Sequence, residues 1–150
     1  MIVRHPWLVV GGAASLAAAL LHVACIFGGP DWYRFFGAGE PLARAAERGS
    51  WVPPLLTLGI ASVLAVWAAY AFSGAGLIPR LPFMRSALVV ISAVYLARGL
   101  VILHPPLFGR TDLSWAFMLW SSLIVLAIGV LYAVGTWRAW PTLSAKGYTV

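Results

Sequence analysis

Charged residues are scarce in this chain, and their scarcity excludes most classes of soluble protein. Only 9% of the 150 residues are Asp, Glu, Lys or Arg, whereas soluble domains carry about a quarter. Apolar residues make up 62% of the chain. This composition belongs in lipid, so we expect a single integral membrane domain over residues 1–150, with no room for a separate soluble catalytic domain.

Cysteine is almost absent, because Cys25 is the only one. A lone cysteine excludes an intramolecular disulfide and every metal site built on paired cysteines. Runs of basic residues are missing too, since the net charge of +6 comes from Lys and Arg scattered singly between apolar stretches. We therefore expect membrane lipids with anionic headgroups as partners, and no nucleic acid.

Sequence motifs of common enzymes are also absent. The chain has no GxSxG, HExxH or P-loop pattern, and the GAG at 37–39 lacks the rest of a dinucleotide-binding motif. None of the four acidic residues falls within a long apolar stretch, so the membrane-embedded carboxylate of small proton-coupled exporters is missing. These absences favour a non-catalytic role.

Long apolar stretches are what the chain does have. Four of them can cross a hydrocarbon core of about 30 Å as α-helices, which satisfy their own backbone hydrogen bonds in lipid. The sequence therefore predicts an all-α four-helix transmembrane bundle. A short amphipathic surface helix is expected at 40–48, because Pro41 suits a first turn and Gly49 a helix end. The predicted spans are residues 7–27, 53–73, 83–103 and 115–136.

Lys and Arg in the connecting segments predict the orientation. One side would carry five cations, and the other four cations with all four acids. This excess predicts a multi-pass protein of a bacterial inner membrane with both termini in the cytoplasm. His22-Val23-Ala24-Cys25 also resembles a lipoprotein cleavage site. The apolar run continues past Cys25 to a full span, however, so we expect the first span to be retained. The five cations are Arg4, Arg80, Arg85, Arg138 and Lys146.

Apart from Arg85 near the start of the third predicted span, Arg98 is the one Lys or Arg inside a predicted span. An Arg at this depth needs an anionic or carbonyl partner if it faces the bundle, or it can snorkel to the headgroups. A spacing of three places Tyr95 and Arg98 on one helical stripe. Glu40 and Asp31 are the candidate partners, although Glu40 can equally pair with Arg44 four residues on, and Asp31 can pair with Arg34.

The segment GGPDWYRFFGAGE, residues 28–40, gathers aromatic side chains beside these acids. Gly37 and Gly39 would let its backbone fold back over the bundle. We therefore expect a polar cavity near the outer face, covered by this segment. The cavity residues are His22, Asp31, Glu40, Tyr95 and Arg98, and the lid aromatics are Trp32, Tyr33, Phe35 and Phe36.

Two histidines allow an alternative. His22 lies near the outer end of the first span, where it could carry protons, bind a metal or haem, or simply pack. His104 follows the third span and offers a second imidazole, so haem b held by His22 and His104 is the alternative cofactor. A zinc site would lack a third ligand. Otherwise we expect no cofactor and no metal.

The stretch GGPDWYRFFGAGE, followed by an apolar span and by YLARGL at 95–100, resembles small four-span proteins of bacterial inner membranes. In size and span count the chain is also similar to DoxX-like proteins and to the sterol-isomerase-related bundle. Neither family's polar motif occurs at matching positions. The resemblance therefore implies a fold and a membrane location, and it implies no activity.

The sequence favours an integral membrane protein that binds a lipid-like, quinone-like or anionic small molecule, or that serves as a subunit of a membrane complex. Arg98 would neutralise an anionic group of the ligand. Small residues at Gly11, Ser15 and Ala19 could serve contacts within the bundle or in a homo-oligomer. The alternative is a haem-binding redox protein or a small transporter that uses His22 and His104.

Overall fold

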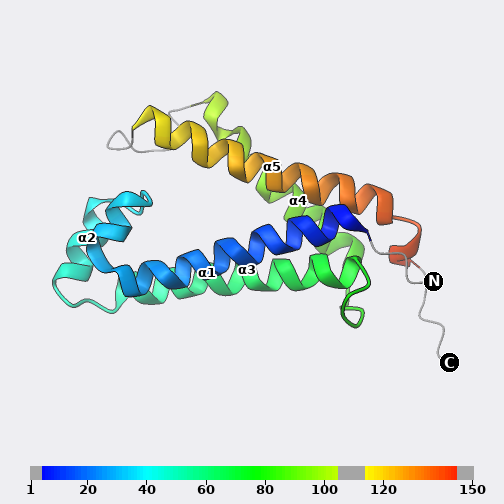
Figure 1. Ribbon diagram of the computed structural model, residues 1–150, viewed down its shortest axis with the longest axis horizontal. Coiled ribbons are helices and arrows are strands. Elements are labelled where there is room, and N and C mark those ends of the chain that lie inside the picture. The colour runs from blue at the N-terminus through cyan, green and yellow to red at the C-terminus, as the bar shows by residue number, and fades with distance from the viewer. Residues whose placement is uncertain (1–4, 105–113, 145–150) are drawn as a thin grey trace.

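The computed structural model describes residues 5–104 and 114–144, and every long element in these ranges is an α-helix (Figure 1). Four helices, one of them extended by a 3-10 turn, are long and apolar enough to cross a membrane. This confirms the predicted all-α bundle of an integral membrane protein. The elements are α1 (Pro6–Phe35), α2 (Glu40–Glu47), α3 (Val52–Gly74), α4 (Met84–Leu100), η1 (Val101–Leu103), α5 (Trp115–Ala139) and η3 (Thr142–Ser144).

The end of α1 differs from the prediction. The first span was expected to stop at Phe27, but helical structure continues to Phe35 across a kink at Gly29, whose φ is 70° and ψ is −155°. Glycine tolerates this left-handed φ, and Pro30, which lacks an N–H, is suited to start the helical turns beyond it. Much of the segment expected to be a loop therefore forms two helical turns set at an angle to the rest of α1.

The short helix α2 begins and ends where its sequence signals indicated. Gly39 precedes it with a φ of 103°, Pro41 lies in its first turn, and Gly49 follows it with a φ of 72°. Its buried Ala43 packs with Cys25 and Tyr33 of α1 in a small apolar cluster. This cluster holds α2 against the end of α1.

The long helices pack as two antiparallel pairs. α1 lies along α3, and α4 lies along α5 (Figure 1). The start of α1 and the end of α5 meet at one end of the molecule, here called the terminal end, and α2 lies at the other, called the α2 end. In the terminal half the pairs are in contact, because Leu8 packs against Gly135 and Gly11 against Tyr132. These small residues therefore serve contacts within the bundle.

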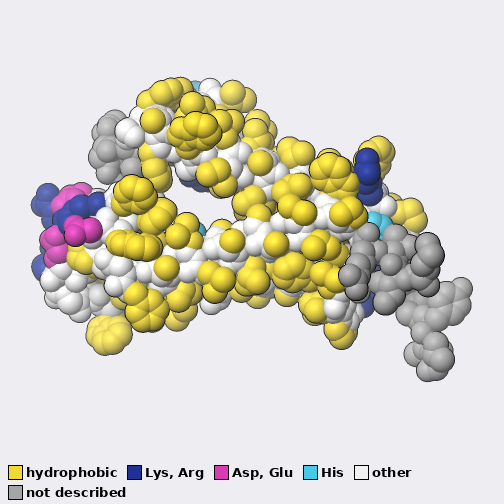
Figure 2. All heavy atoms as spheres, viewed as in Figure 1, with side chains coloured by type: hydrophobic (Ala, Val, Ile, Leu, Met, Phe, Trp, Pro, Cys, Tyr) yellow, Lys and Arg dark blue, Asp and Glu magenta, His cyan; other side chains and the backbone are white. Residues whose placement is uncertain are grey.

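Toward the α2 end the two pairs separate. Figure 2 shows an opening between the α1–α3 pair and the half of α5 nearer the α2 end, bordered mostly by hydrophobic side chains. α4 and α5 stay together there, because Gly99 lies directly against the backbone of Leu126. The opening therefore lies between the pairs and not within either one.

Candidate functional site between the helix pairs

A cluster of buried hydroxyl groups lies where the pairs begin to separate. The Oγ atom of Ser15 lies 2.8 Å from the hydroxyl of Tyr95 and 2.9 Å from that of Tyr132. Tyr132 in turn donates to the backbone carbonyl of Trp67 at 3.0 Å. These residues come from α1, α4, α5 and α3 respectively, so one hydrogen-bonded layer joins all four long helices.

The direction of each hydrogen bond in this layer follows from counting protons. The carbonyl of Trp67 can only accept, so the single hydroxyl proton of Tyr132 is used there. Ser15 must then donate to Tyr132, and Tyr95 must donate to Ser15. The result is a directed chain in which every hydroxyl donor is satisfied. Ser15 and Tyr132 are its inner members, because each takes part in two of the three bonds, and Tyr95 is its end.

Aromatic packing surrounds the hydroxyl layer. The ring of Tyr95 lies edge-on to that of Trp67, with centroids 4.9 Å apart, and 5.3 Å from that of Tyr132. Ser15 is nine residues past the start of α1, which places the layer about 14 Å along that helix and close to mid-membrane depth. Polar groups at this depth need internal partners, and the directed chain supplies them.

One face of α3 shows how the opening arises. In the terminal half this face is covered by α4, because Gly74 lies against Leu88 and Met84, and Trp67 against Tyr95. Val63, Ile60 and Leu56 continue the same face at helical spacing, yet all three are exposed. At this level α4 does not cover α3. A groove of about 730 Å³ follows this bare stripe from Val52 to Trp67, with almost entirely apolar walls.

Two of the predicted polar residues, His22 of α1 and Arg98 of α4, lie beside the opening on helices of different pairs. His22 lies seven residues beyond Ser15 on α1, on the face that meets α5 in the terminal half. Arg98 lies three residues beyond Tyr95 on α4, at the edge of the stripe that holds the buried Ile91. His22 is half-buried and Arg98 is exposed. Of the five predicted cavity residues, His22, Tyr95 and Arg98 thus continue the faces that turn toward the opening.

The tautomer of His22 is fixed by its helix. Its Nδ1 atom lies 2.7 Å from the carbonyl oxygen of Ala18, and because a carbonyl only accepts, Nδ1 carries a proton. In the neutral ring, Nε2 is then the acceptor. His22 can therefore accept a hydrogen bond or a metal at Nε2 while its ring is held in place.

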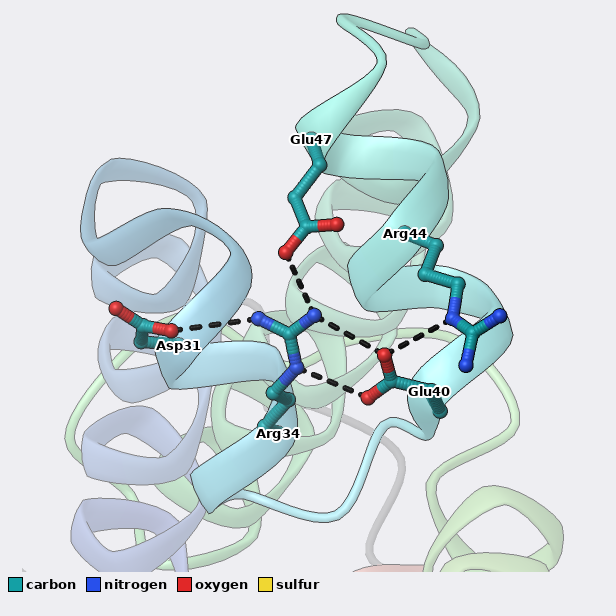
Figure 3. A network of polar contacts seen from close by, with 5 residues as sticks. All are labelled: Asp31, Arg34, Glu40, Arg44 and Glu47. Atoms are coloured by element: carbon teal, nitrogen blue, oxygen red, sulfur yellow. Dashed lines mark hydrogen bonds and ion pairs between the residues drawn. The ribbon is translucent and has the colours of Figure 1, made fainter.

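Asp31 and Glu40, the other two predicted cavity residues, lie in an ion-pair cluster around Arg34 (Figure 3). Arg34 binds Glu40 through both Nε and Nη2, at 2.9 and 3.1 Å, and it binds Glu47 at 2.6 Å. Arg44 binds Glu40 at 3.0 Å. The Glu40–Arg44 alternative is therefore present, and Arg34 takes the place proposed for Arg98. These hydrogen bonds lower the pKa of Glu40 to about 2.

The predicted lid aromatics take different positions. Tyr33 is buried under α2, and its hydroxyl accepts a hydrogen bond from Thr57 of α3 at 3.4 Å. Phe36 is half-buried, with its ring near those of Trp32 and Phe35. Trp32 and Phe35 are exposed on the last turns of α1. Only Tyr33 is therefore enclosed, and it joins α1 to α3 beside the cluster of Arg34.

His104, the second ligand of the haem alternative, is exposed at the end of η1. Within the described ranges no group of three or more His, Cys, Asp or Glu side chains could hold a metal ion. The sequence interpretation missed Tyr132 and Trp67, and it treated Ser15 only as a small packing residue. A tyrosine in the middle of an apolar span was the available signal, because its hydroxyl needs a partner in lipid.

Comparison with protein family models, curated proteins and solved structures gives no match. The function of this chain therefore has to be inferred from the geometry of the opening and of the hydroxyl layer.

Proposed function

We propose that this protein binds a lipid-like molecule in the opening between its two helix pairs. The observation that carries the proposal is the bare face of α3, which α4 covers in the terminal half and leaves exposed beside Leu56, Ile60 and Val63. An apolar chain along this face would restore the missing contacts. The groove runs from Val52 to Trp67 of α3, or about 22 Å, which is most of the hydrocarbon thickness.

The polar end of the ligand would lie beside His22 and Arg98. Both positions are on the α2 side of the hydroxyl layer, so a group placed between them remains within the opening. The guanidinium of Arg98 favours an anionic or strongly accepting group, and the Nε2 acceptor of His22 favours a donor on the same group. A quinone-like or acidic amphiphile has this chemistry.

We also propose the topology that places this opening toward the outside of a bacterial inner membrane. Arg80, Arg85 and Arg138 lie at the terminal end, and the acids of the described ranges lie at the α2 end. The distribution supports cytoplasmic termini. Single cysteines placed at Arg48 and at Ser86, in a Cys25→Ser background, would test it. An impermeant thiol reagent applied to spheroplasts should label only the first, and labelling of only the second would reverse the topology.

Filling the groove tests ligand binding directly. Ile60→Trp would occupy the bare face, whereas Leu58→Trp adds the same bulk to the opposite face of α3, at an equal exposed fraction of 49%. Native mass spectrometry of the purified variants should show a small-molecule adduct on the wild type and on Leu58→Trp, and a loss of that adduct on Ile60→Trp. Equal adducts on both variants would refute the site. An adduct of protein mass would identify a partner helix in place of a lipid-like ligand.

Haem binding is the second candidate, and the tautomer of His22 favours it. A histidine that donates from Nδ1 to a carbonyl presents Nε2 to a metal, which is the usual arrangement of a metal-bound imidazole. The iron would be held by His22, with His104 as the proposed partner. An absorption spectrum of the purified protein separates the candidates, because bound haem gives an intense Soret band. If that band is present and is lost in His22→Phe, haem replaces the lipid-like ligand in this proposal.

A further inference from the structure

A second groove lies at the terminal end, between α4 and α5 and away from the opening. It has a volume of about 620 Å³. Its deeper part is lined by Val89, Ala93, Leu96 and Ala133, and the rings of Trp137 and Trp140 form its outer wall. Tryptophan is typical of the membrane interface. The groove therefore runs from the interface into the hydrocarbon layer.

One hydroxyl in this groove has no partner among the described residues. Thr136 lines the groove, its side chain is 4% exposed, and its Oγ1 atom makes no hydrogen bond to any described residue. Most helical threonines in lipid donate to the carbonyl four residues earlier. An unsatisfied buried donor is costly, so this hydroxyl is suited to an acceptor that enters the groove from outside the chain.

A guanidinium group stands at the mouth of the same groove. Arg85 continues the stripe of Val89 and Ser92, and its Cζ atom lies 4.4 Å from the ring centre of Trp140. Its Nη2 atom donates to the Trp140 carbonyl at 2.9 Å, while its buried Nε makes no hydrogen bond within the described ranges. Arg80 and Arg85 together line a depression of about 590 Å³. The contact of Arg85 with Trp140 relates this depression to the groove.

We propose that this groove binds an anionic phospholipid of the surrounding membrane. The phosphate lies in the depression beside Arg80 and Arg85, an ester oxygen accepts from Thr136 one turn deeper, and an acyl chain follows Val89 to Leu96. The order of these groups along the groove matches their order along a phospholipid. The positive charge at the mouth matches the headgroup, since no acid lies at this end in the described ranges. This site is separate from the opening and does not depend on the function proposed for it.

Matched substitutions on α5 and at the terminal end test this site. Thr136→Val removes the unpartnered hydroxyl at nearly constant volume. Ser122→Ala is its control, because Ser122 of α5 is also buried and has no hydrogen-bond partner within the described ranges, but it does not line the groove. Arg85→Gln removes the charge at the mouth. Arg138→Gln is its control, because Arg138 lies over the ring of Trp7 on α1.

The measurement is native mass spectrometry of each variant after reconstitution in phosphatidylcholine vesicles with and without phosphatidylglycerol. The wild type should retain phosphatidylglycerol in preference to phosphatidylcholine. Thr136→Val should lower the retained fraction about threefold to tenfold, the equivalent of one hydrogen bond. Arg85→Gln should abolish the preference, and both control variants should behave as the wild type.

Three outcomes would overturn the proposal. An equal loss in Arg85→Gln and Arg138→Gln would mean diffuse attraction to a charged surface instead of a site. An unchanged Thr136→Val would mean that no lipid ester lies at this hydroxyl, and therefore that the phospholipid does not occupy the groove as proposed. Displacement of phosphatidylglycerol by inorganic phosphate would mean that the depression holds a free anion, with no role for the groove. Circular dichroism of each variant separates loss of lipid from loss of fold.

Discussion

Ser15 and Tyr95 lie eighty residues apart in the chain, and their hydroxyl oxygens are 2.8 Å apart in the structure. This contact joins α1 to α4, the members of different helix pairs, at the depth where the pairs begin to separate. It is one link in the chain of hydrogen bonds from Tyr95 through Ser15 and Tyr132 to the carbonyl of Trp67. Replacing Ser15, which makes two of these hydrogen bonds, should therefore change the stability more than replacing Tyr95, which makes one.

Loss of the Ser15 hydroxyl should destabilise the protein more than loss of the Tyr95 hydroxyl. Ser15→Ala removes two hydrogen bonds, and Tyr95→Phe removes one. At about 1 kcal/mol for each hydrogen bond in a membrane, the expected losses are about 2 and about 1 kcal/mol. Unfolding in mixed detergent micelles measures both. Tyr70→Phe is the control, since the Tyr70 hydroxyl makes no hydrogen bond to a described residue. A larger loss for Tyr95→Phe than for Ser15→Ala would contradict this arrangement of hydrogen bonds.

Adding a methyl group at Gly99 should force α4 and α5 apart. A Cβ atom there would lie 2.7 Å from the Cα of Leu126, closer than van der Waals contact allows. Gly99→Ala should cost about 1 to 3 kcal/mol of unfolding free energy, as overpacking does. Gly59→Ala on α3 meets no atom within 4 Å and should be neutral or stabilising by up to about 1 kcal/mol. Equal effects of the two substitutions would mean that the helices adjust without cost.

The attachment of α2 should depend on pH only in strongly acidic solution. The pKa of Glu40 is lowered from 4.5 to about 2 by its hydrogen bonds to Arg34 and Arg44. A lowered carboxyl pKa means that the ion pairs stabilise the folded state above about pH 4.5, and that this contribution is lost as the pH falls toward 2. Amide hydrogen exchange of residues 40–47, corrected for intrinsic rates, should stay constant down to about pH 4 and rise below it. A transition between pH 5 and 7 would exclude Glu40 as its cause.

Arg34 should hold α2 more strongly than any other arginine near it. Its guanidinium binds Asp31, Glu40 and Glu47, whereas Arg48 makes no ion pair with a described residue. Arg34→Gln should therefore increase hydrogen exchange throughout α2, and Arg48→Gln should leave it unchanged. The same experiment at high salt reports the electrostatic part, since exposed ion pairs are screened. Equal protection in both variants would mean that the apolar cluster of Tyr33 and Ala43 alone holds this helix.

The sequence predicts the helices of this protein better than it predicts which helices meet. Hydropathy locates the four long helices because each is apolar on all sides. Because each helix is apolar on all sides, hydropathy does not indicate which face contacts another helix. The sequence therefore does not predict that Ser15 and Tyr132 are hydrogen-bond partners. The pairing of Arg34 with Glu40 was missed for another reason. The segment after Gly29 reads as a loop, and only its helical turns bring Arg34 between Asp31 and Glu40. Local signals such as Pro41 and Gly49, in contrast, predicted α2 correctly.

The hydroxyl layer also gives the bundle a fulcrum. Between this layer and the α2 end, the two helices of each pair stay packed against each other. Each pair can therefore rotate about the layer as a rigid body, and its longer part points toward α2. The arm of α3 from Trp67 to Val52 is about 22 Å, and a rotation of about 5° would move its far end by about 2 Å. Occupants of different thickness can therefore be admitted by a small tilt, because the short arm of α3 from Trp67 to Gly74 is about 10 Å long and its end would move by only about 1 Å.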